Sequence, residues 1–143
     1  MDLEKHLTEI TRLRREADSF PDDNPAALMQ KIEILAKCMV YVGRVSSYLD
    51  GEYKRIYAER KRKYAEAYIK APRSKEAHAE LAVADLREIE AKAYEDSRRW
   101  RNAFDSLTEE IHALKLKMRV DFATEVADYV RIPSSTKDQA QTR

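Results

Sequence analysis

The chain has 143 residues, which is a length typical of one domain, and its 27 basic and 26 acidic side chains nearly cancel. Charged residues make up 37% of it and there are only two Gly and four Pro, which favours long helices and excludes a strand-rich fold with frequent turns. One Cys excludes an intramolecular disulfide framework, and no apolar run reaches the roughly 20 residues of a membrane span, so we expect a cytoplasmic protein without a membrane segment.

Residues 2–18 have the apolar spacing of a short amphipathic helix. The apolar side chains recur every three or four residues, which places them on one face. They are Leu3, Leu7, Ile10, Leu13 and Ala17.

A long helix is predicted over residues 25–70. Asn24 is a suitable N-cap, and Pro25 fits the first helical position. A heptad seam then runs for four heptads, as in a coiled coil. Its members are Leu28, Ile32, Leu35, Met39, Val42, Ser46, Leu49, Tyr53 and Ile56. Beyond Ile56 an eleven-residue spacing replaces the heptad, which indicates a change in packing.

A second long helix is predicted over residues 75–131, after a short connection in which Ser74 is the expected N-cap. Its first half is rich in Ala, and its second half carries a heptad seam of large apolar residues. That seam consists of Trp100, Phe104, Leu107, Ile111, Leu114 and Met118. Residues 132–143 are polar and are expected to form a disordered tail.

The expected fold is all-α, a long antiparallel helical hairpin that resembles a coiled coil. A four-residue connection makes the two long helices antiparallel neighbours. The helix over 2–18 then turns back and covers the far end of the hairpin, so that a three-helix base continues into a two-helix arm. Residues 1–131 would form one elongated domain.

Charge is distributed unevenly along this hairpin. Residues 53–75 contain nine basic and two acidic side chains, whereas residues 76–96 contain seven acidic and two basic ones. The hairpin places these segments side by side, so we expect much of the basic segment to be matched within the molecule.

A basic run with interleaved tyrosines is the sharpest local feature. It comprises Arg60, Lys61, Arg62 and Lys63 with Tyr57, Tyr64 and Tyr68. One interpretation is a helix face that pairs with its acidic neighbour. The other is a nucleic-acid surface, in which cations follow the phosphate backbone and bases stack on the rings. Four consecutive charges point in every direction around a helix, so both interpretations remain open.

A second basic cluster surrounds Trp100, which is in phase with the seam and is therefore expected in the core. Arg98, Arg99 and Arg101 flank it and could contact a partner or a phosphate.

Catalytic and metal-binding motifs are weak in this chain. Glu109 and His112 form one Glu-x-x-His, but the phase of Ile111 places both on the outer face, and carboxylate-bridged metal sites need inward ligands from several helices. Cys38 precedes Met39 of the seam and is expected to be half-buried. The chain has no Gly-rich phosphate loop and no metal-ligand cysteine pair, so no cofactor, no metal and no enzymatic activity are expected.

The seam from Trp100 to Ile111, followed by Leu114-Lys115-Leu116-Lys117, resembles a group of small helical accessory proteins from the early regions of tailed bacteriophages. Their genes often lie near replication and recombination genes. The resemblance covers residues 94–120. It implies an accessory protein of the bacterial cytoplasm that binds a replication or recombination component or inhibits a host protein, and it implies no catalytic residue.

Two functions follow as hypotheses. The first is a non-enzymatic interaction module that binds a protein partner through helix faces and forms homo-oligomers, because a two-helix arm cannot cover all its apolar side chains. The second is a nucleic-acid-binding accessory that uses residues 53–75 and the arginines around Trp100.

Overall fold

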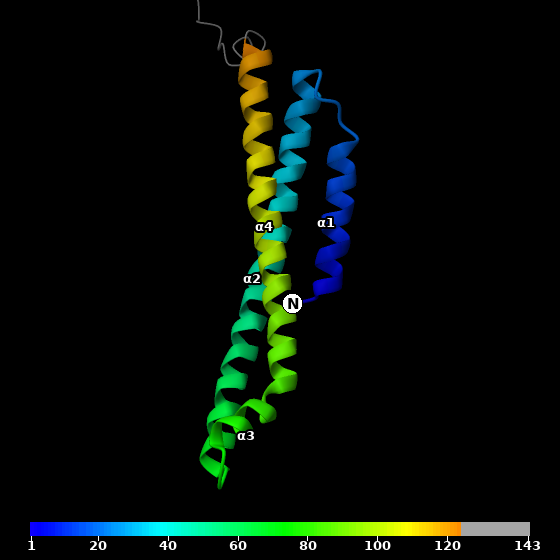
Figure 1. The fold of residues 1–143 in the computed structure, drawn as a ribbon. Coiled ribbons are helices and arrows are strands. Elements are labelled where there is room, and N and C mark those ends of the chain that lie inside the picture. Colours follow the sequence, from blue (N-terminus) through cyan, green and yellow to red (C-terminus); the bar gives the residue numbers. More distant parts are fainter. Residues whose placement is uncertain (124–143) are drawn as a thin grey trace, which may run out of the picture.

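The computed structural model describes residues 1–123, and this part of the chain is all-α. Four helices follow one another along it (Figure 1), with no strand among these residues. They are α1 (Leu3–Asp18), α2 (Pro25–Lys70), α3 (Lys75–Ala82) and α4 (Ala84–Asp121). The predicted tail and the predicted helical residues 124–131 lie outside the described residues.

The longest helix, α2, begins as its sequence predicts. The Asn24 side chain accepts a hydrogen bond of 2.8 Å from the backbone N–H of Ala27, and Pro25 occupies the first turn, where its missing N–H has no cost. The helix continues without interruption for 46 residues and ends at Lys70. The next residue, Ala71, has an extended backbone, as expected before Pro72. At 1.5 Å per residue α2 spans roughly 70 Å.

α2 and α4 form the predicted antiparallel hairpin. The rings of Tyr53 and Tyr94 meet with their centroids 5.3 Å apart. Nearer the other end, the Thr108 hydroxyl lies 3.4 Å from the Met39 sulfur. Phe104 lies so close to Gly43 that a Cβ added there would be 3.2 Å from the ring.

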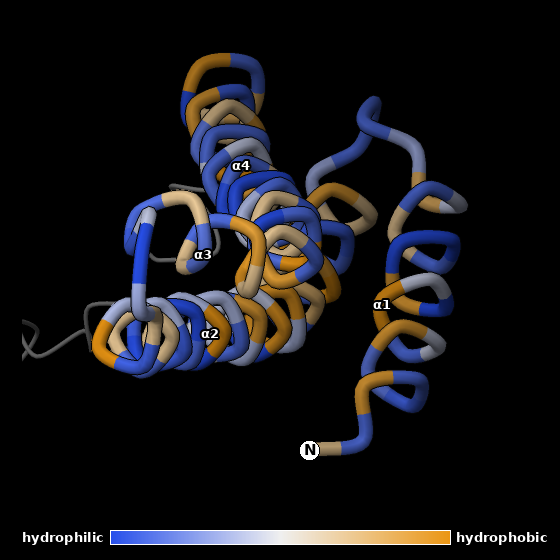
Figure 2. Tube along the Cα trace, turned by 60° about the horizontal axis from the view of Figure 1, so that its bottom comes forward, coloured by the Kyte–Doolittle hydropathy of each residue, from blue (hydrophilic) through white to orange (hydrophobic). Residues whose placement is uncertain are grey.

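The core lies in the base of the molecule, which we define as residues 1–49 and 98–123. α1 packs along α2 here, and its apolar side faces the other two helices (Figure 2). The buried core residues come from all three helices. They are Leu13, Ala17, Ile34, Leu35, Cys38, Val42, Leu107 and Ile111. The three-helix base predicted from the sequence is therefore present.

One side of α2 is more deeply buried than its sequence suggested. Cys38 is 1% exposed, so the expectation of a half-buried side chain is wrong. The reason is α1, which covers the side of α2 that carries Ile34 and Cys38. The Cys38 thiol lies 3.8 Å from the carbonyl oxygen of Ile10, and burial raises the pKa of this thiol.

The prediction of one continuous helix over residues 75–131 is wrong in one respect, because the helix is interrupted at Val83. Val83 has φ −110° and ψ 7°, and its N–H points to the carbonyls of Glu80 and Leu81 at the end of α3. No Gly or Pro occurs between residues 73 and 123 to mark this break. Val83 and Ala79 are fully buried, so packing at the end of the hairpin compensates for the interrupted helical hydrogen bonds.

Ser74 does not act as the predicted N-cap. Its side chain makes no capping hydrogen bond, and its φ of 47° lies in the left-handed region. The short connection after Pro72 requires this conformation to reverse the chain direction. In the part of the chain that the structure describes, no helix is both long and apolar enough to cross a membrane.

Candidate interaction surfaces

The arm, which we define as residues 53–96, presents apolar side chains to solvent. Ile69 is 76% exposed and Leu81 is 79% exposed, more than any other large apolar residue of the described part. Other exposed apolar residues of the arm are Tyr57, Tyr68, Ile89 and Tyr94. The largest apolar side chains at the tip thus lie outside any core of this chain.

Arg60 is the member of the basic run that faces α4. Its guanidinium forms an ion pair with Glu90, with Nη2 3.3 Å from Oε1, and only 14% of each side chain is exposed. The hydrogen bond from Arg60 to Glu90 raises the pKa of this arginine. Arg60 therefore belongs to the packing of the arm, as the structural interpretation predicts.

The other three cations of the run point elsewhere. Lys63 pairs with Glu59 of its own helix at 3.5 Å. Lys61 and Arg62 are exposed and form no ion pair with any residue in 1–123. Arg60–Glu90 is thus the one ion pair that joins residues 53–75 to residues 76–96 in the described structure, so the broad charge matching expected from the sequence is wrong.

A hollow of about 460 Å³ lies beside Arg60, on the surface where α2, α3 and α4 meet. It is lined by Arg60, Lys61, Tyr64, Glu80 and Arg87. Arg87 and Glu80 bridge the break at Val83 through an ion pair of 3.0 Å. Sequence reasoning missed both residues, because they are seven positions apart and come together only through the break. Three cations and one carboxylate give this hollow a positive balance.

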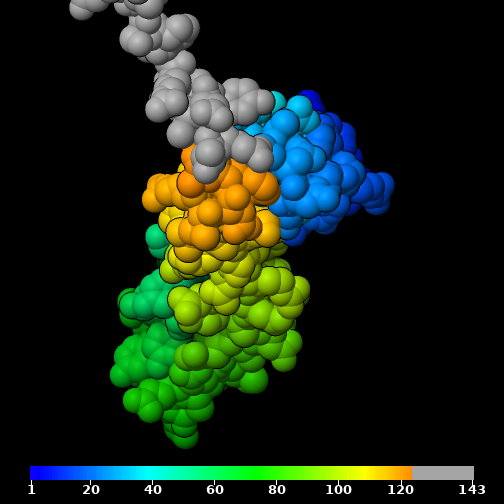
Figure 3. Space-filling model, turned by 90° about the horizontal axis from the view of Figure 1, so that it is seen from above, coloured from blue at the N-terminus to red at the C-terminus, as the bar shows by residue number. Residues whose placement is uncertain are grey.

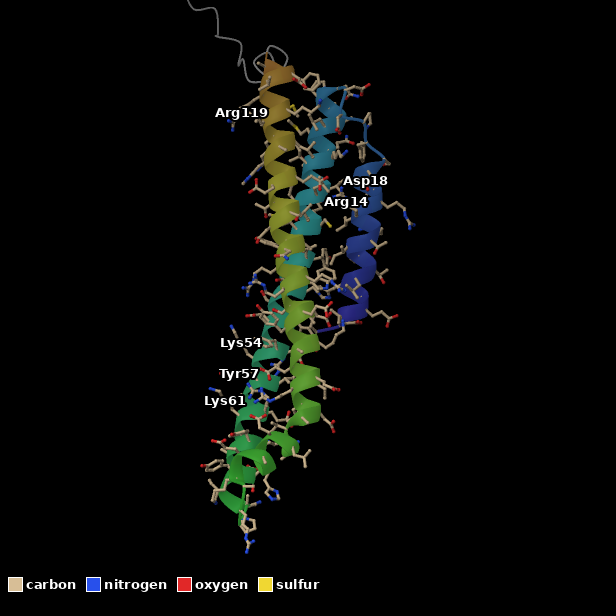
Figure 4. All side chains as sticks on the ribbon, in the orientation of Figure 1. Arg14, Asp18, Lys54, Tyr57, Lys61 and Arg119 are labelled. Carbon is tan, nitrogen blue, oxygen red and sulfur yellow. The ribbon has the colours of Figure 1, made fainter. Side chains whose placement is uncertain are left out.

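The tyrosines of the arm are divided between packing and exposure. Tyr64 and Tyr68 stack with centroids 6.3 Å apart and an angle of 23° between the rings. Lys61 holds its ammonium 4.8 Å from the centroid of Tyr57, which is 37% exposed. Figure 4 shows Lys54, Tyr57 and Lys61 in succession along α2. Cations and accessible rings therefore alternate along one stretch of the arm.

The second basic cluster lies closer to the base. Trp100 packs against the core, as predicted. Arg99 pairs with Glu95 at 2.8 Å, and Arg101 pairs with Asp50 at 3.2 Å. Arg98 is exposed. Asp50 lies eleven positions before Lys61 on α2, or about 16 Å along the helix, so the structure does not merge the two basic clusters.

Asp50 forms ion pairs with cations from both helices of the hairpin. Lys54 contacts it at 2.9 Å, and the Ser97 hydroxyl donates to it over 3.4 Å. These contacts, the Lys54 hydrogen bond first, lower the pKa of Asp50.

Glu109 and His112 are exposed on either side of buried Ile111, as the heptad phase predicts. Within residues 1–123, no group of three or more His, Cys, Asp and Glu side chains is arranged to hold a metal ion.

The chain was compared with known proteins. No family model, curated protein or solved structure matches the chain.

Proposed function

We propose that the chain is a non-enzymatic interaction module that binds a protein partner through the exposed arm and associates with further copies of itself. The observation that carries this proposal is the exposure of Ile69 and Leu81 at the tip. Large apolar side chains that remain in water are typical anchors of protein interfaces when they occur together.

The architecture supports the same function. The arm projects beyond α1 (Figure 1), so its helix faces are accessible from several directions. A hairpin of two long helices also provides little concavity for a substrate, whereas helix faces are a common mode of protein recognition.

The test is capture of partners from a bacterial lysate, with the Ile69→Ser, Leu81→Ser double variant beside the unaltered chain. The matched control is Leu116→Ser, since Leu116 is also exposed, at 59%, but lies in the base. We expect the double variant to lose a partner that the control retains. Equal capture by all three chains would contradict a role of the arm tip.

The alternative function is a nucleic-acid-binding accessory. The observation in its favour is that Lys61 and Arg62 are exposed and form no ion pair within the described residues, and that Lys61 lines the cationic hollow. The Lys61→Gln, Arg62→Gln variant leaves the Arg60–Glu90 pair intact, and is therefore expected to keep its stability. If the alternative holds, its affinity in a gel shift falls, and the slope of log affinity against log salt becomes shallower by about two.

The resemblance of residues 94–120 to phage accessory proteins leads to a prediction about the identity of the captured partner. A replication or recombination component would agree with it.

A further inference from the structure

In the base, α2 carries uncharged side chains on three of its sides. The other described helices pack on two of these sides. α4 packs on the side of Leu35 and Val42, and α1 packs on the side of Ile34 and Cys38. We call the third side the open face. Its residues recur in steps of three or four, so they form one continuous strip along the helix. It comprises Met29, Ile32, Ala36, Val40, Gly43 and Ser47.

Most of the open face lies on the side of α2 away from α1, and Val40 lies at its edge nearest to α1. Phe104 and Thr108 of α4 border it, through their contacts with Gly43 and Met39. α1 packs on the other side of α2 (Figure 2), and the blue atoms of α1 lie beside the orange end of α4 in the space-filling view (Figure 3). Met29 is 53% exposed and Val40 is 51% exposed, so both side chains are accessible to solvent, and Val40 also lines a hollow beside Glu9 and Leu13 of α1.

Charges on α4 next to the open face have a two-fold pattern. Asp105 and Glu109 precede His112 by seven and three residues, and Arg119 and Lys115 follow it at the same distances. All four are exposed, and none forms an ion pair with another residue of 1–123. Figure 4 shows Arg119 extending from α4 on the side away from α1.

We propose that the open face binds the open face of a second copy of this chain, in antiparallel orientation about a two-fold axis near His112. In that arrangement Asp105 faces Arg119 of the second copy, and Glu109 faces Lys115 of the second copy. Symmetry forms each ion pair twice. This inference rests on the proposed function, and it names the surface through which copies of the chain associate.

The same axis can be located on α2. The hairpin register, in which Met39 lies beside Thr108, places Leu35 opposite His112. The axis near His112 therefore passes level with Leu35 of α2.

The apolar side chains fit this arrangement as well. An axis near Leu35 brings Met29 level with Val40 of the second copy. Ala36 lies next to the axis, where a small side chain lets two helices approach closely. The two arms then extend from opposite ends of a shared base.

A charge exchange tests the orientation. Arg119→Asp places two carboxylates opposite each other, twice, and is expected to weaken dimerisation about tenfold in sedimentation experiments. Asp105→Arg added to it restores opposite charges and should return the dissociation constant to near its original value. Within one copy these residues are fourteen positions, or about 21 Å, apart, so they do not contact each other. Rescue therefore reports on contact between copies.

A second variant tests the face itself. Met29→Glu with Val40→Glu should give a monomer that keeps its helical circular dichroism, whereas Ser106→Glu, at an exposed position about 120° around α4 from His112, should remain dimeric. A wild-type chain that stays monomeric throughout the micromolar range, or a dimer unaffected by the Met29 and Val40 changes, overturns the proposal. So does a monomer whose open face is protected only after an unlike protein is added. The Ile69→Ser, Leu81→Ser variant should remain dimeric, so failure here is distinguishable from failure of partner binding at the tip.

Discussion

The base and the arm are built on the same helix, α2, yet they are held together in different ways. In the base, Leu28, Leu35 and Val45 of α2 are fully buried. Between residues 46 and 70 the same helix has no buried residue. Burial in the arm returns only at the tip, with Ala71, Ala79 and Val83.

This difference shows what a third helix contributes. Two helices in contact bury one stripe each and leave both flanks in water, whereas α1 closes one flank and creates a core. Long helices derive most of their stability from such packing. The middle of the arm depends instead on tyrosine contacts and on the Arg60–Glu90 pair, and its surface remains available for partners.

Removing a large side chain from the base is expected to have the largest effect. Leu107→Ala and Ile111→Ala should each lower the free energy of unfolding by about 2–5 kcal/mol, because both residues are buried where three helices meet. Urea denaturation measures this change. The matched control Leu116→Ala, at an exposed position, should cost less than about 0.5 kcal/mol. Equal losses for all three would mean that the base has no specific core.

Breaking the ion pair of the arm is expected to have a smaller effect. Glu90→Gln removes the partner of Arg60, and it should cost about 1 kcal/mol, near the upper end for ion pairs that retain contact with water. Glu95→Gln removes the partner of Arg99 and serves as the control, with little change expected because the Glu95 side chain is 60% exposed. A loss for Glu90→Gln as large as that for Leu107→Ala would show that the arm and the base are equally cohesive.

The turn at the tip offers a change in the opposite direction. Ser74→Gly should stabilise the chain by about 0.5–1 kcal/mol, because Gly adopts the left-handed conformation without a steric cost and the Ser74 side chain makes no capping bond that would be lost. Thermal unfolding measures the gain. Ser74→Val should destabilise, since a β-branched residue is poorly suited to positive φ.

The smallest expected effect concerns pH, at the junction of arm and base. The lowered pKa of Asp50 means that its contacts stabilise the fold above the unfolded-state pKa, and that this contribution disappears as the pH falls through the folded-state pKa. Asp50→Asn should therefore flatten the loss of stability below about pH 5. Denaturation at several pH values checks this. An unchanged pH profile would contradict it.

The sequence predicted the helices of the base well because local signals and burial agree there. Asn24 and Pro25 define the start of α2, and the seam through Leu107 and Ile111 is buried as its phase requires. The break at Val83 could not be predicted, since no Gly or Pro occurs between residues 73 and 123 and only packing at the tip produces the break. The burial of Cys38 was missed because it depends on which side of α2 receives α1.

The residues of the candidate surface were predicted less completely. Their identity as cations and rings was evident from Arg60, Lys61 and Tyr57, but which cation faces α4 depends on helix rotation. The structure separates Arg60, which pairs with Glu90, from Lys61, which does not. Glu80 and Arg87 gave no local signal, because their ion pair depends on the geometry of a broken helix.

The position of Cys38 beneath α1 has a consequence for measurement. The chain contains one thiol, and it is shielded by a helix that packs mainly on α2. Burial also raises its pKa, which keeps the unreactive thiol form dominant. Its rate of labelling by a thiol reagent should therefore report how often α1 detaches from the hairpin. Comparison with the free energy of global unfolding would show whether α1 opens as a separate cooperative unit.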